Sequence, residues 1–191
     1  WFETAGAVVS MDIPDRIKDG YGINEHLIDK AWQDGVDTIV TCDNGIAAIE
    51  QIAYAKELGM TVIVTDHHEI PYEETEQGHR FLRVNADATI NPKQPDCVYP
   101  YKLLCGGAVA YKLIQALYAR LGRIPDQAGI ILEKYIVFAA IATIGDVVDL
   151  TGENRILAKL GLNRIAGTDN NGLLALAEAN ALDLNHITSY H

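Results

Sequence analysis

The stretch Gly59-Met60-Thr61-Val62-Ile63-Val64-Thr65-Asp66-His67-His68-Glu69 is an apolar run that ends abruptly in acids and imidazoles. Its β-favouring residues, bounded by a glycine and a charged cluster, predict a buried parallel strand. Ligands collect at the carboxyl ends of strands in open α/β sheets, so the cluster stands where a site is expected. A single histidine there is more often a hydrogen-bonded surface or core residue, but the pair after Asp66 favours a metal site with carboxylate and imidazole ligands. Because adjacent side chains on extended backbone point to opposite faces, we expect His67 and His68 to have different roles.

A second strand with the same kind of ending precedes this one. Residues 36–42 are mostly apolar and β-favouring, and an Asp-Asn-Gly turn follows them from Asp43. Apolar residues at helical spacing over 46–58 then predict a crossover helix, which completes a β-α-β unit. Such crossovers make the strands parallel, so Asp43 and the Asp66 cluster are expected at one edge of the sheet, where they could share a metal centre. Asp43 also fits a simple turn.

The remaining patterns predict an α/β fold in which helices flank the parallel sheet. We expect the end of a helix over 1–5, short strands over 7–13 and 88–92, a polar loop over 71–80, and helices over 24–33, 108–121, 135–145, 151–165 and 173–181. The stretch 135–145 is the most apolar but falls short of the roughly 20 residues of a membrane-spanning helix, so we interpret it as a buried core helix and expect no membrane partner. Gly106 and Gly107 open the preceding helix, where they permit either anion binding or, more commonly, close packing.

Four further residues are candidates for a site. A loop with a Gly-Tyr-Gly segment carries Arg16 and Tyr21, and it could be a plain turn or could contact phosphate and base. Asp146 emerges at the end of the most apolar helix, where a carboxylate must be paired, hydrogen-bonded or bound to metal. Arg155, on the next helix, could pair with phosphate, although a nearby acid is the more common partner.

Composition narrows the classes of partner. The formal net charge is −11, which argues against an extended phosphate-binding surface because nonspecific nucleic-acid affinity comes mostly from Lys and Arg. Bound divalent ions can reverse the sign of an acidic cleft, so a nucleic-acid substrate stays compatible with this charge. Three cysteines without metal-knuckle spacing indicate core thiols in a reducing cytoplasm. The chain begins at Trp1 without a basic-then-apolar leader, and we interpret it as a piece of a longer protein.

Six separated segments carry recognisable motifs. They are Ile13-Pro14-Asp15-Arg16 with Gly20-Tyr21-Gly22, Thr41-Cys42-Asp43-Asn44-Gly45-Ile46, Asp66-His67-His68-Glu69, Asn91-Pro92-Lys93-Gln94, Leu104-Cys105-Gly106-Gly107, and Ile144-Gly145-Asp146-Val147-Val148 followed by Glu153-Asn154-Arg155. In this order, over nearly the whole chain, they resemble the DHH phosphoesterases. The Arg-Ile-Lys-Asp-Gly-Tyr-Gly loop is more similar to the RecJ-type exonucleases specific for single-stranded DNA than to the oligonucleotide or cyclic-dinucleotide phosphodiesterases of the same superfamily.

The resemblance implies a two-metal hydrolase that digests single-stranded DNA from 5′ to 3′ in DNA repair and recombination, with Mn²⁺ or Mg²⁺ as cofactors. It implies that Asp43, His67 and Asp146 are metal ligands, with Asp43 the bridge, and that His68 contacts the scissile phosphate. Asp66 would orient a histidine. By the same resemblance, the metals assist attack of hydroxide on phosphorus and neutralise charge on the phosphate.

The chain departs from the family pattern in one respect. The first motif of the family, an Asp-x-Asp-Gly strand end, should lie just before Trp1. We therefore interpret residues 1–191 as a partial DHH domain that lacks its first motif strand, with a β-α-β metal-site half over 1–100 and a mainly helical half over 101–191. We expect it to bind metal poorly and to lack nuclease activity alone.

Two alternatives remain open. One is a phosphodiesterase for short RNA or cyclic dinucleotides, and the other is a non-catalytic DHH-fold scaffold. For the RecJ type, the expected partners are single-stranded DNA, which Arg16, Tyr21 and Arg155 would contact, and a single-strand-binding protein.

Overall fold

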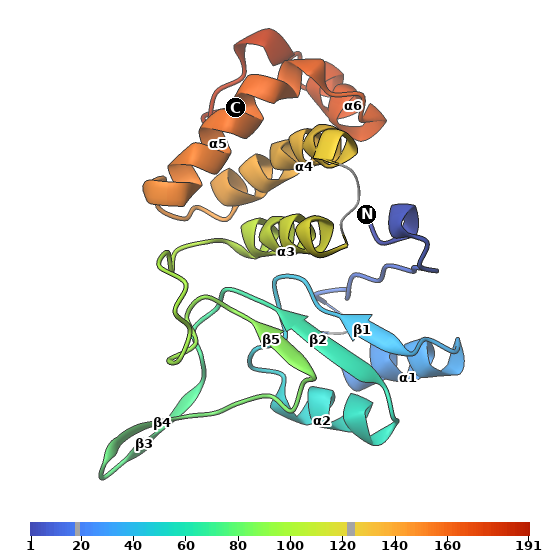
Figure 1. Cartoon of the computed structure of the whole chain (residues 1–191), viewed down its shortest axis with the longest axis vertical. Coiled ribbons are helices and arrows are strands. Elements are labelled where there is room, and N and C mark those ends of the chain that lie inside the picture. Colours follow the sequence, from blue (N-terminus) through green and yellow to red (C-terminus); the bar gives the residue numbers. More distant parts are fainter. Residues whose placement is uncertain (18–19, 122–124) are drawn as a thin grey trace. The chain divides into compact units, whose positions relative to one another are not determined.

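The structure is a computed structural model that describes residues 1–17, 20–121 and 125–191, with side chains described outside 125–132. The contacts divide the chain into two compact units, Trp1–Val98 and Tyr99–His191. The strands lie in the first unit, and the second unit is helical (Figure 1).

The first unit is built on a parallel sheet of three short strands. β1 (Thr38–Val40), β2 (Thr61–Thr65) and β5 (Ala88–Ile90) lie in the order β1-β2-β5, and both neighbouring pairs are parallel. Helix α2 (Ile49–Glu57) forms the crossover between β1 and β2, and α1 (Glu25–Gln33) packs against it (Figure 1). The predicted β-α-β unit is confirmed.

A small apolar core joins these helices to the sheet. Its buried members are Ile28, Ile52, Ala55, Met60, Val62 and Val64. Because full burial of a large aliphatic side chain is worth about 1.5–3 kcal/mol, this cluster stabilises the sheet on which the site depends. Helix α1 begins where the sequence predicts, since the Asn24 side chain accepts a hydrogen bond from the Leu27 N–H at 3.0 Å.

The prediction of a polar loop over 71–80 is wrong, because these residues form most of a β-hairpin. β3 (Tyr72–Thr75) and β4 (Gly78–Phe81) pair antiparallel. The rings of Tyr72 and His79 stack with 4.0 Å between their centroids. Cross-strand pairs of this kind stabilise strands that an acid-rich sequence does not favour by itself.

The strand predicted over 7–13 is also wrong. The segment follows a 3-10 turn, η1 (Glu3–Ala5), and pairs with no other strand in the part of the chain that the structure describes. Val8 and Met11 are exposed. A strand needs a neighbour that satisfies its backbone groups, and β-favouring residues alone do not supply one.

The second unit consists of packed helices. Its elements are α3 (Gly106–Arg120), α4 (Pro125–Gly145), α5 (Gly152–Arg164), η2 (Ile165–Gly167), α6 (Asn171–Ala179) and η3 (Leu184–His186). Helix α4 packs against both α3 and α5. The helices predicted over 108–121, 151–165 and 173–181 are confirmed to within two residues at each end.

Helix α4 is longer than the predicted 135–145 and is not buried on all sides. Ile136 and Ala140 are buried, whereas Phe138 and Ile141 are 42% and 38% exposed. A run of apolar residues without helical periodicity does not reveal which side faces away from the core. Within the described residues, no helix combines the length and apolar character that a membrane span requires.

Two glycines allow these helices to approach closely. A Cβ atom at Gly107 would lie 2.4 Å from the Cβ of Ala142, and one at Gly161 would lie 2.3 Å from the Cβ of Ala140. Real Cβ atoms do not approach so closely, so a larger residue would force the helices apart. For Gly107, this supports close packing, the more common of the two roles that the sequence left open.

Candidate metal centre

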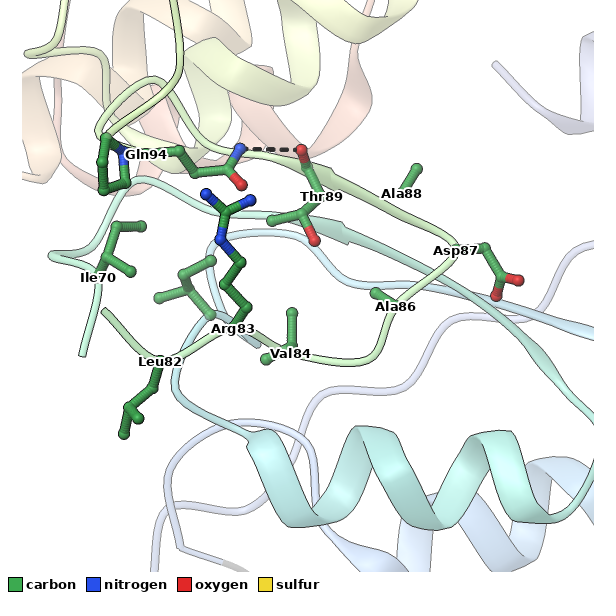
Figure 2. A pocket seen from close by; sticks show the side chains of 11 residues that line it. Ile70, Leu82, Arg83, Val84, Ala86, Asp87, Ala88, Thr89 and Gln94 are labelled. Carbon is green, nitrogen blue, oxygen red and sulfur yellow. Dashed lines mark hydrogen bonds between the residues drawn. The ribbon is translucent and has the colours of Figure 1, made fainter. Parts of the chain in front are cut away.

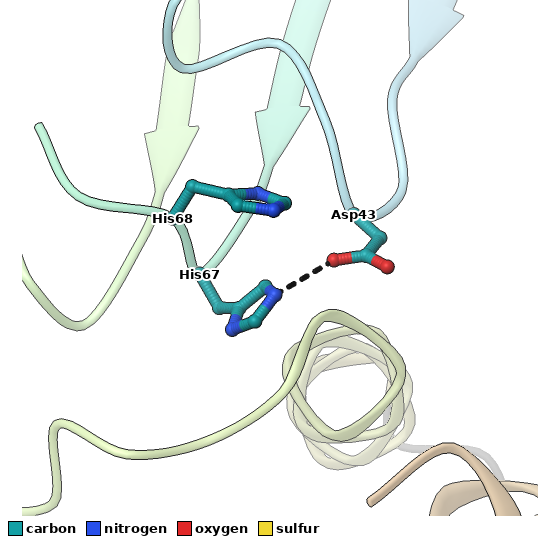
Figure 3. Close-up of side chains that lie close together, drawn as sticks. All are labelled: Asp43, His67 and His68. Carbon is teal, nitrogen blue, oxygen red and sulfur yellow. Dashed lines mark ion pairs between the residues drawn. The ribbon is translucent and has the colours of Figure 1, made fainter. Parts of the chain in front are cut away.

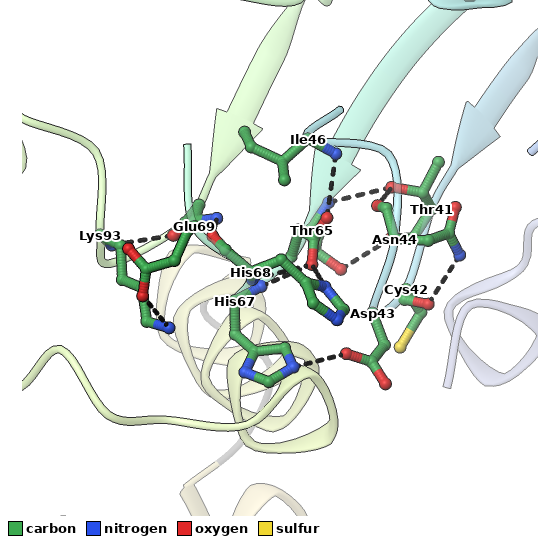
Figure 4. A network of polar contacts seen from close by, with 12 residues as sticks. Thr41, Cys42, Asp43, Asn44, Ile46, Thr65, His67, His68, Glu69 and Lys93 are labelled. Atoms are coloured by element: carbon green, nitrogen blue, oxygen red, sulfur yellow. Dashed lines mark hydrogen bonds and ion pairs between the residues drawn. The ribbon is translucent and has the colours of Figure 1, made fainter. Parts of the chain in front are cut away.

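Asp43 lies in a tight turn at the carboxyl end of β1 (Figure 4). The Thr41 hydroxyl donates to the Asn44 carbonyl at 2.7 Å, and the Asp43 N–H donates to the Thr65 carbonyl of β2 at 3.0 Å. Asp43 adopts φ +63°, which aspartate tolerates better than most residues, and Gly45 adopts φ +106°. Asp43 is therefore a turn residue, and this turn places its carboxylate beside the end of β2.

Asp66 is a buried hydrogen-bond acceptor just after β2. Its side chain is 1% exposed, and its Oδ2 accepts the Ile46 N–H at 2.9 Å. Its Oδ1 accepts the N–H groups of His67 and His68 at 2.7 and 3.2 Å and lies 2.6 Å from His68 Nδ1. Burial alone would raise the pKa of Asp66, but these hydrogen bonds outweigh it and hold the pKa below its usual value. The ionised carboxylate can only accept, so it fixes the His68 ring with the proton on Nδ1.

Asp43, His67 and His68 form a cluster of candidate ligands. One ligand atom from each lies within 4.8 Å of the others. The distance from His67 Nε2 to Asp43 Oδ1 is 3.0 Å, and the two imidazole rings are 4.5 Å apart between centroids (Figure 3). The His67 side chain is 11% exposed, whereas the side chains of His68 and Asp43 are each 44% exposed. The cluster thus combines one nearly buried imidazole with two accessible groups.

The sequence predicted that the rings of His67 and His68 would point to opposite faces, and this prediction is wrong. β2 ends at Thr65, and the Asp66 carboxylate draws the next two N–H groups toward itself. This turn brings both rings to one side (Figure 3). Alternation of side chains applies to extended backbone, so different roles for His67 and His68 must depend on their chemical surroundings.

The donor set fits a divalent cation. Asp43 supplies carboxylate oxygens, and His67 presents Nε2 toward them. Because the Nδ1–H of His68 is held by Asp66, its Nε2 is the nitrogen that can accept, which is the arrangement of a carboxylate behind a metal-binding histidine. Mixed oxygen and imidazole ligands suit hard and borderline divalent ions.

Two further predicted site residues lie beside this cluster. The Tyr21 ring stands edge-on to the His68 ring, with 6.3 Å between centroids. The guanidinium carbon of Arg16 lies 5.6 Å from the centroid of the Tyr21 ring, and both side chains are exposed. Residues 18–19 of the same loop lie outside the described residues. The loop presents a cation and an aromatic ring next to the candidate ligands.

Asn91 supports the site in a way that the sequence did not reveal. It is 2% exposed, and its Nδ2 donates to the His68 carbonyl at 2.9 Å while its Oδ1 accepts the Lys93 N–H at 2.8 Å. Lys93 also forms an ion pair with Glu69 at 2.8 Å. The available signal was the Asn-Pro pair at the end of β5, because neighbouring strand ends of a parallel sheet meet at one edge.

Asp146 and Arg155 lie in the second unit. Asp146 directly follows α4, its N–H donates to the Ala142 carbonyl at 2.9 Å, and its side chain is exposed. Arg155 is exposed on α5, and it takes part in no ion pair among the residues that the structure describes. The expected pairing of Arg155 with an acid is therefore wrong.

A separate hollow of about 270 Å³ lies next to β5 (Figure 2). Ile70, Leu82 and Val84 contribute apolar surface to it, and Arg83 and Gln94 contribute polar groups. None of the predicted site residues lines this hollow, so it is not part of the candidate metal centre.

The chain is similar in sequence to proteins named single-stranded-DNA-specific exonucleases. It is 43% identical over 178 residues to exonuclease RecJ of Bacillus subtilis, covering 93% of this chain and 20% of the relative. It is 39% identical over 181 residues to exonuclease RecJ of Salmonella typhimurium, covering 92% of this chain and 30% of the relative. The chain thus spans between a fifth and a third of the length of these curated relatives.

A solved structure and a family profile also match this chain. A crystal structure of exonuclease RecJ bound to manganese superposes with a TM-score of 0.74 at 32% identity, covering 93% of this chain and 41% of that chain. The sequence profile of the DHH family, N-terminal domain, matches residues 2–143. With its α/β fold and parallel sheet, the chain therefore belongs to the DHH family.

Proposed function

We propose that the whole protein carrying this chain is a RecJ-type exonuclease that hydrolyses phosphodiester bonds of single-stranded DNA, in DNA repair and recombination. The observation that carries the proposal is the convergence of Asp43, His67 and His68 within 4.8 Å at the end of two parallel strands. The exonuclease relatives and the manganese in a related crystal structure support divalent cofactors, Mn²⁺ or Mg²⁺, with two ions as the family resemblance implies.

The candidate site residues have distinct tasks under this proposal. Asp43 and His67 hold metal, and Asp146 is a further ligand by the family resemblance. A bound divalent ion supplies charge neutralisation at the attacked phosphate and lowers the pKa of water. By the family resemblance, His68 contacts the scissile phosphate, and Asp66 orients its ring through the 2.6 Å contact with Nδ1. Asp66 acts through His68 and is a positioning residue.

Basic and aromatic side chains would hold the DNA strand. Arg16 offers a guanidinium that suits a phosphate, and Tyr21 offers an exposed ring on which a base can stack. Arg155 is a third candidate contact. A single-strand-binding protein as partner and a cytoplasmic location complete the proposal. Cys42, Cys97 and Cys105 form no disulfide in the described part of the chain, which is compatible with a reducing compartment.

The first experiment compares substrates for the purified whole protein with Mn²⁺. We expect it to digest a long 5′-phosphorylated single strand much faster than the matching duplex or a ribo- or cyclic dinucleotide. Preference for a dinucleotide would instead assign the protein to the oligonucleotide phosphodiesterases. The 191-residue chain assayed beside it should show no digestion, because it spans less than a third of the length of its exonuclease relatives.

The second experiment replaces a ligand. His67→Ala should abolish digestion while the circular dichroism spectrum is unchanged, and His26→Ala, which removes an exposed histidine of α1, should leave digestion intact. Full activity of His67→Ala would favour a site elsewhere. Absence of activity from the unaltered protein on every substrate would favour a scaffold.

A further inference from the structure

The turn that carries Asp146 contains a strained residue. Val147, the next residue, adopts φ +57°. This left-handed conformation costs on the order of 1–3 kcal/mol and is a clear outlier for a β-branched side chain, so surrounding structure must impose it. The Val147 side chain is 88% exposed, so its own packing does not impose it. The restraint must come from the backbone on either side.

On one side, the end of α4 holds the turn. The Asp146 N–H donates to the Ala142 carbonyl at 2.9 Å, and the Val147 N–H donates to the Ile144 carbonyl at 3.1 Å. These bonds continue the helix into the turn. They fix the backbone before Val147 but not the backbone after it.

On the other side, Asn154 holds the turn. Its side chain is fully buried in the first part of α5, and its Nδ2 donates to the Asp149 carbonyl at 3.0 Å. The same Nδ2 donates to the Leu103 carbonyl at 2.6 Å. One amide group therefore ties the chain after Asp146 to α5 and to the segment before α3.

The start of α5 is itself anchored, so it can serve as a fixed point. Gly152 adopts φ +45°, and a Cβ there would meet the Tyr101 ring at 2.6 Å. The Tyr101 hydroxyl donates to the Thr151 carbonyl at 2.8 Å. Glu153 forms an ion pair with Lys112 of α3 at 2.6 Å. Packing, a hydrogen bond and an ion pair thus fix the residues on both sides of Gly152.

We propose that Asn154 is a positioning residue that holds the turn of Asp146 to Asp149, and thereby sets the carboxylate of Asp146 for metal binding. The metal role of Asp146 is part of the function proposed above, and this inference rests on it. Hydrogen bonds from one buried amide keep Val147 in the strained conformation, because relaxation of Val147 would pull the Asp149 carbonyl away from Asn154.

The test compares two variants of the whole protein. One lacks the side-chain amide of Asn154, and the other has a shortened apolar side chain in the same helix. Asn154→Ala deletes both hydrogen bonds, and Leu157→Ala deletes buried apolar contacts of α5. Hydrogen exchange is measured at the N–H groups of Asp146 and Val147, with that of Ala140 inside α4 as reference. Mn²⁺ binding is measured by the paramagnetic resonance signal of the free ion.

We expect Asn154→Ala to accelerate exchange at Asp146 and Val147 by about tenfold or more relative to Ala140, and to weaken Mn²⁺ binding by a similar factor. Leu157→Ala should change exchange at all three positions alike and leave Mn²⁺ affinity unchanged. Equal patterns in the two variants would overturn the proposal. Failure of the unaltered protein to bind Mn²⁺ would overturn the proposed function instead, and with it the metal role of Asp146.

A second variant tests the link to backbone strain. Val147→Gly permits φ +57° without strain, so little drives the turn open when the amide is lost. In the Val147→Gly background, Asn154→Ala should therefore accelerate exchange at Asp146 several-fold less than in the unaltered protein. If Asn154→Ala accelerated exchange equally in both backgrounds, strain at Val147 would not contribute to opening of the turn.

Discussion

The two compact units present their candidate ligands by different means. In Trp1–Val98, adjacent parallel strands end side by side, so Asp43 and His67 meet because of the sheet. In Tyr99–His191, Asp146 follows a helix and depends on a strained turn that Asn154 holds. A sheet edge brings ligands together through its own backbone pairing, whereas a helix end needs a dedicated side chain to fix the residue after it.

The largest expected effect tests the sheet edge. Asp43→Asn keeps a residue type that tolerates φ +63° and removes the charge. We expect kcat of the whole protein to fall by about 10³-fold, because a metal-assisted hydrolysis loses a charged ligand, while the midpoint of urea unfolding changes little. Digestion of 5′-phosphorylated single-stranded DNA with Mn²⁺ measures kcat.

The matched control is Asp37→Asn, which makes the same change in an exposed residue just before β1. It should leave kcat within twofold, within the range of surface substitutions. Similar losses in the two variants would mean that net charge, rather than the position of Asp43 at the strand end, controls activity. The inference that the sheet edge places Asp43 for activity would then be wrong.

The sheet edge could be predicted from the sequence because each step follows a strong rule. Apolar runs ending in Asp43 and Asp66, joined by a helical segment, require parallel strands with their ends at one edge. Asn24 as helix cap and Gly107 as a packing position follow from equally local chemistry. The contact of the Asp66 carboxylate with the imidazole ring of His68, rather than with the ring of His67, could not be predicted, because it depends on a turn that starts where the strand stops.

Other features depend on partners that are distant in the sequence or on backbone strain. The hairpin of β3 and β4 pairs an acid-rich run with residues that look like a loop, and ring stacking supplies part of its stability. The strand expected over 7–13 lacks a paired neighbour in the described chain. The strained φ of Val147 leaves no trace in composition or periodicity. Propensity is weak wherever such tertiary contacts decide.

The second prediction separates positioning from metal binding at the same edge. Asp66→Asn places an amide where a buried carboxylate accepts four hydrogen bonds. We expect a loss of about 2–4 kcal/mol in the free energy of unfolding, and a fall of about 10–100-fold in kcat because His68 loses its orienting partner. Urea unfolding and DNA digestion measure the two effects.

The contribution of Asp66 to the free energy of unfolding decreases as the pH is lowered. The folded-state pKa of Asp66 is lowered, so its contribution to stability is present above the unfolded pKa of about 3.9 and is lost as pH falls through the folded value. The stability of Asp66→Asn should therefore fall less steeply below pH 4.

The control for the loss of kcat is Asp87→Asn. It alters a partly exposed carboxylate that binds the opposite end of β2 and should leave kcat unchanged. A loss of kcat there would show that any weakening of β2 impairs the site.

The third prediction concerns the packing of the helical unit. In Gly161→Ala, the new Cβ would lie 2.3 Å from the Cβ of Ala140 and 2.5 Å from the Ile136 carbonyl oxygen, so α4 and α5 must separate. We expect a loss of about 1–3 kcal/mol in the free energy of unfolding. Gly167→Ala, where a Cβ meets nothing within 4 Å, should change it by less than about 0.5 kcal/mol. Equal stability of the two variants would show that close helix contact is not what orders this unit.

The smallest expected effect lies near the end of the helical unit, far along the chain from any candidate ligand. The Asn185 N–H, followed by the side chains of His186 and Asn185, lowers the pKa of Asp183 to about 2. Its contribution to the turn η3 is therefore present above pH 4 and is lost as pH falls from about 4 to about 2. Carboxyl chemical shifts followed against pH give this pKa directly, and Asp183→Asn should accelerate hydrogen exchange at Asn185 at neutral pH. Glu178→Gln, an exposed change on α6, should leave that exchange rate as it was. If Asp183 titrated near 4, its carboxylate would not be holding η3, and the turn would have to depend on packing like the helices before it.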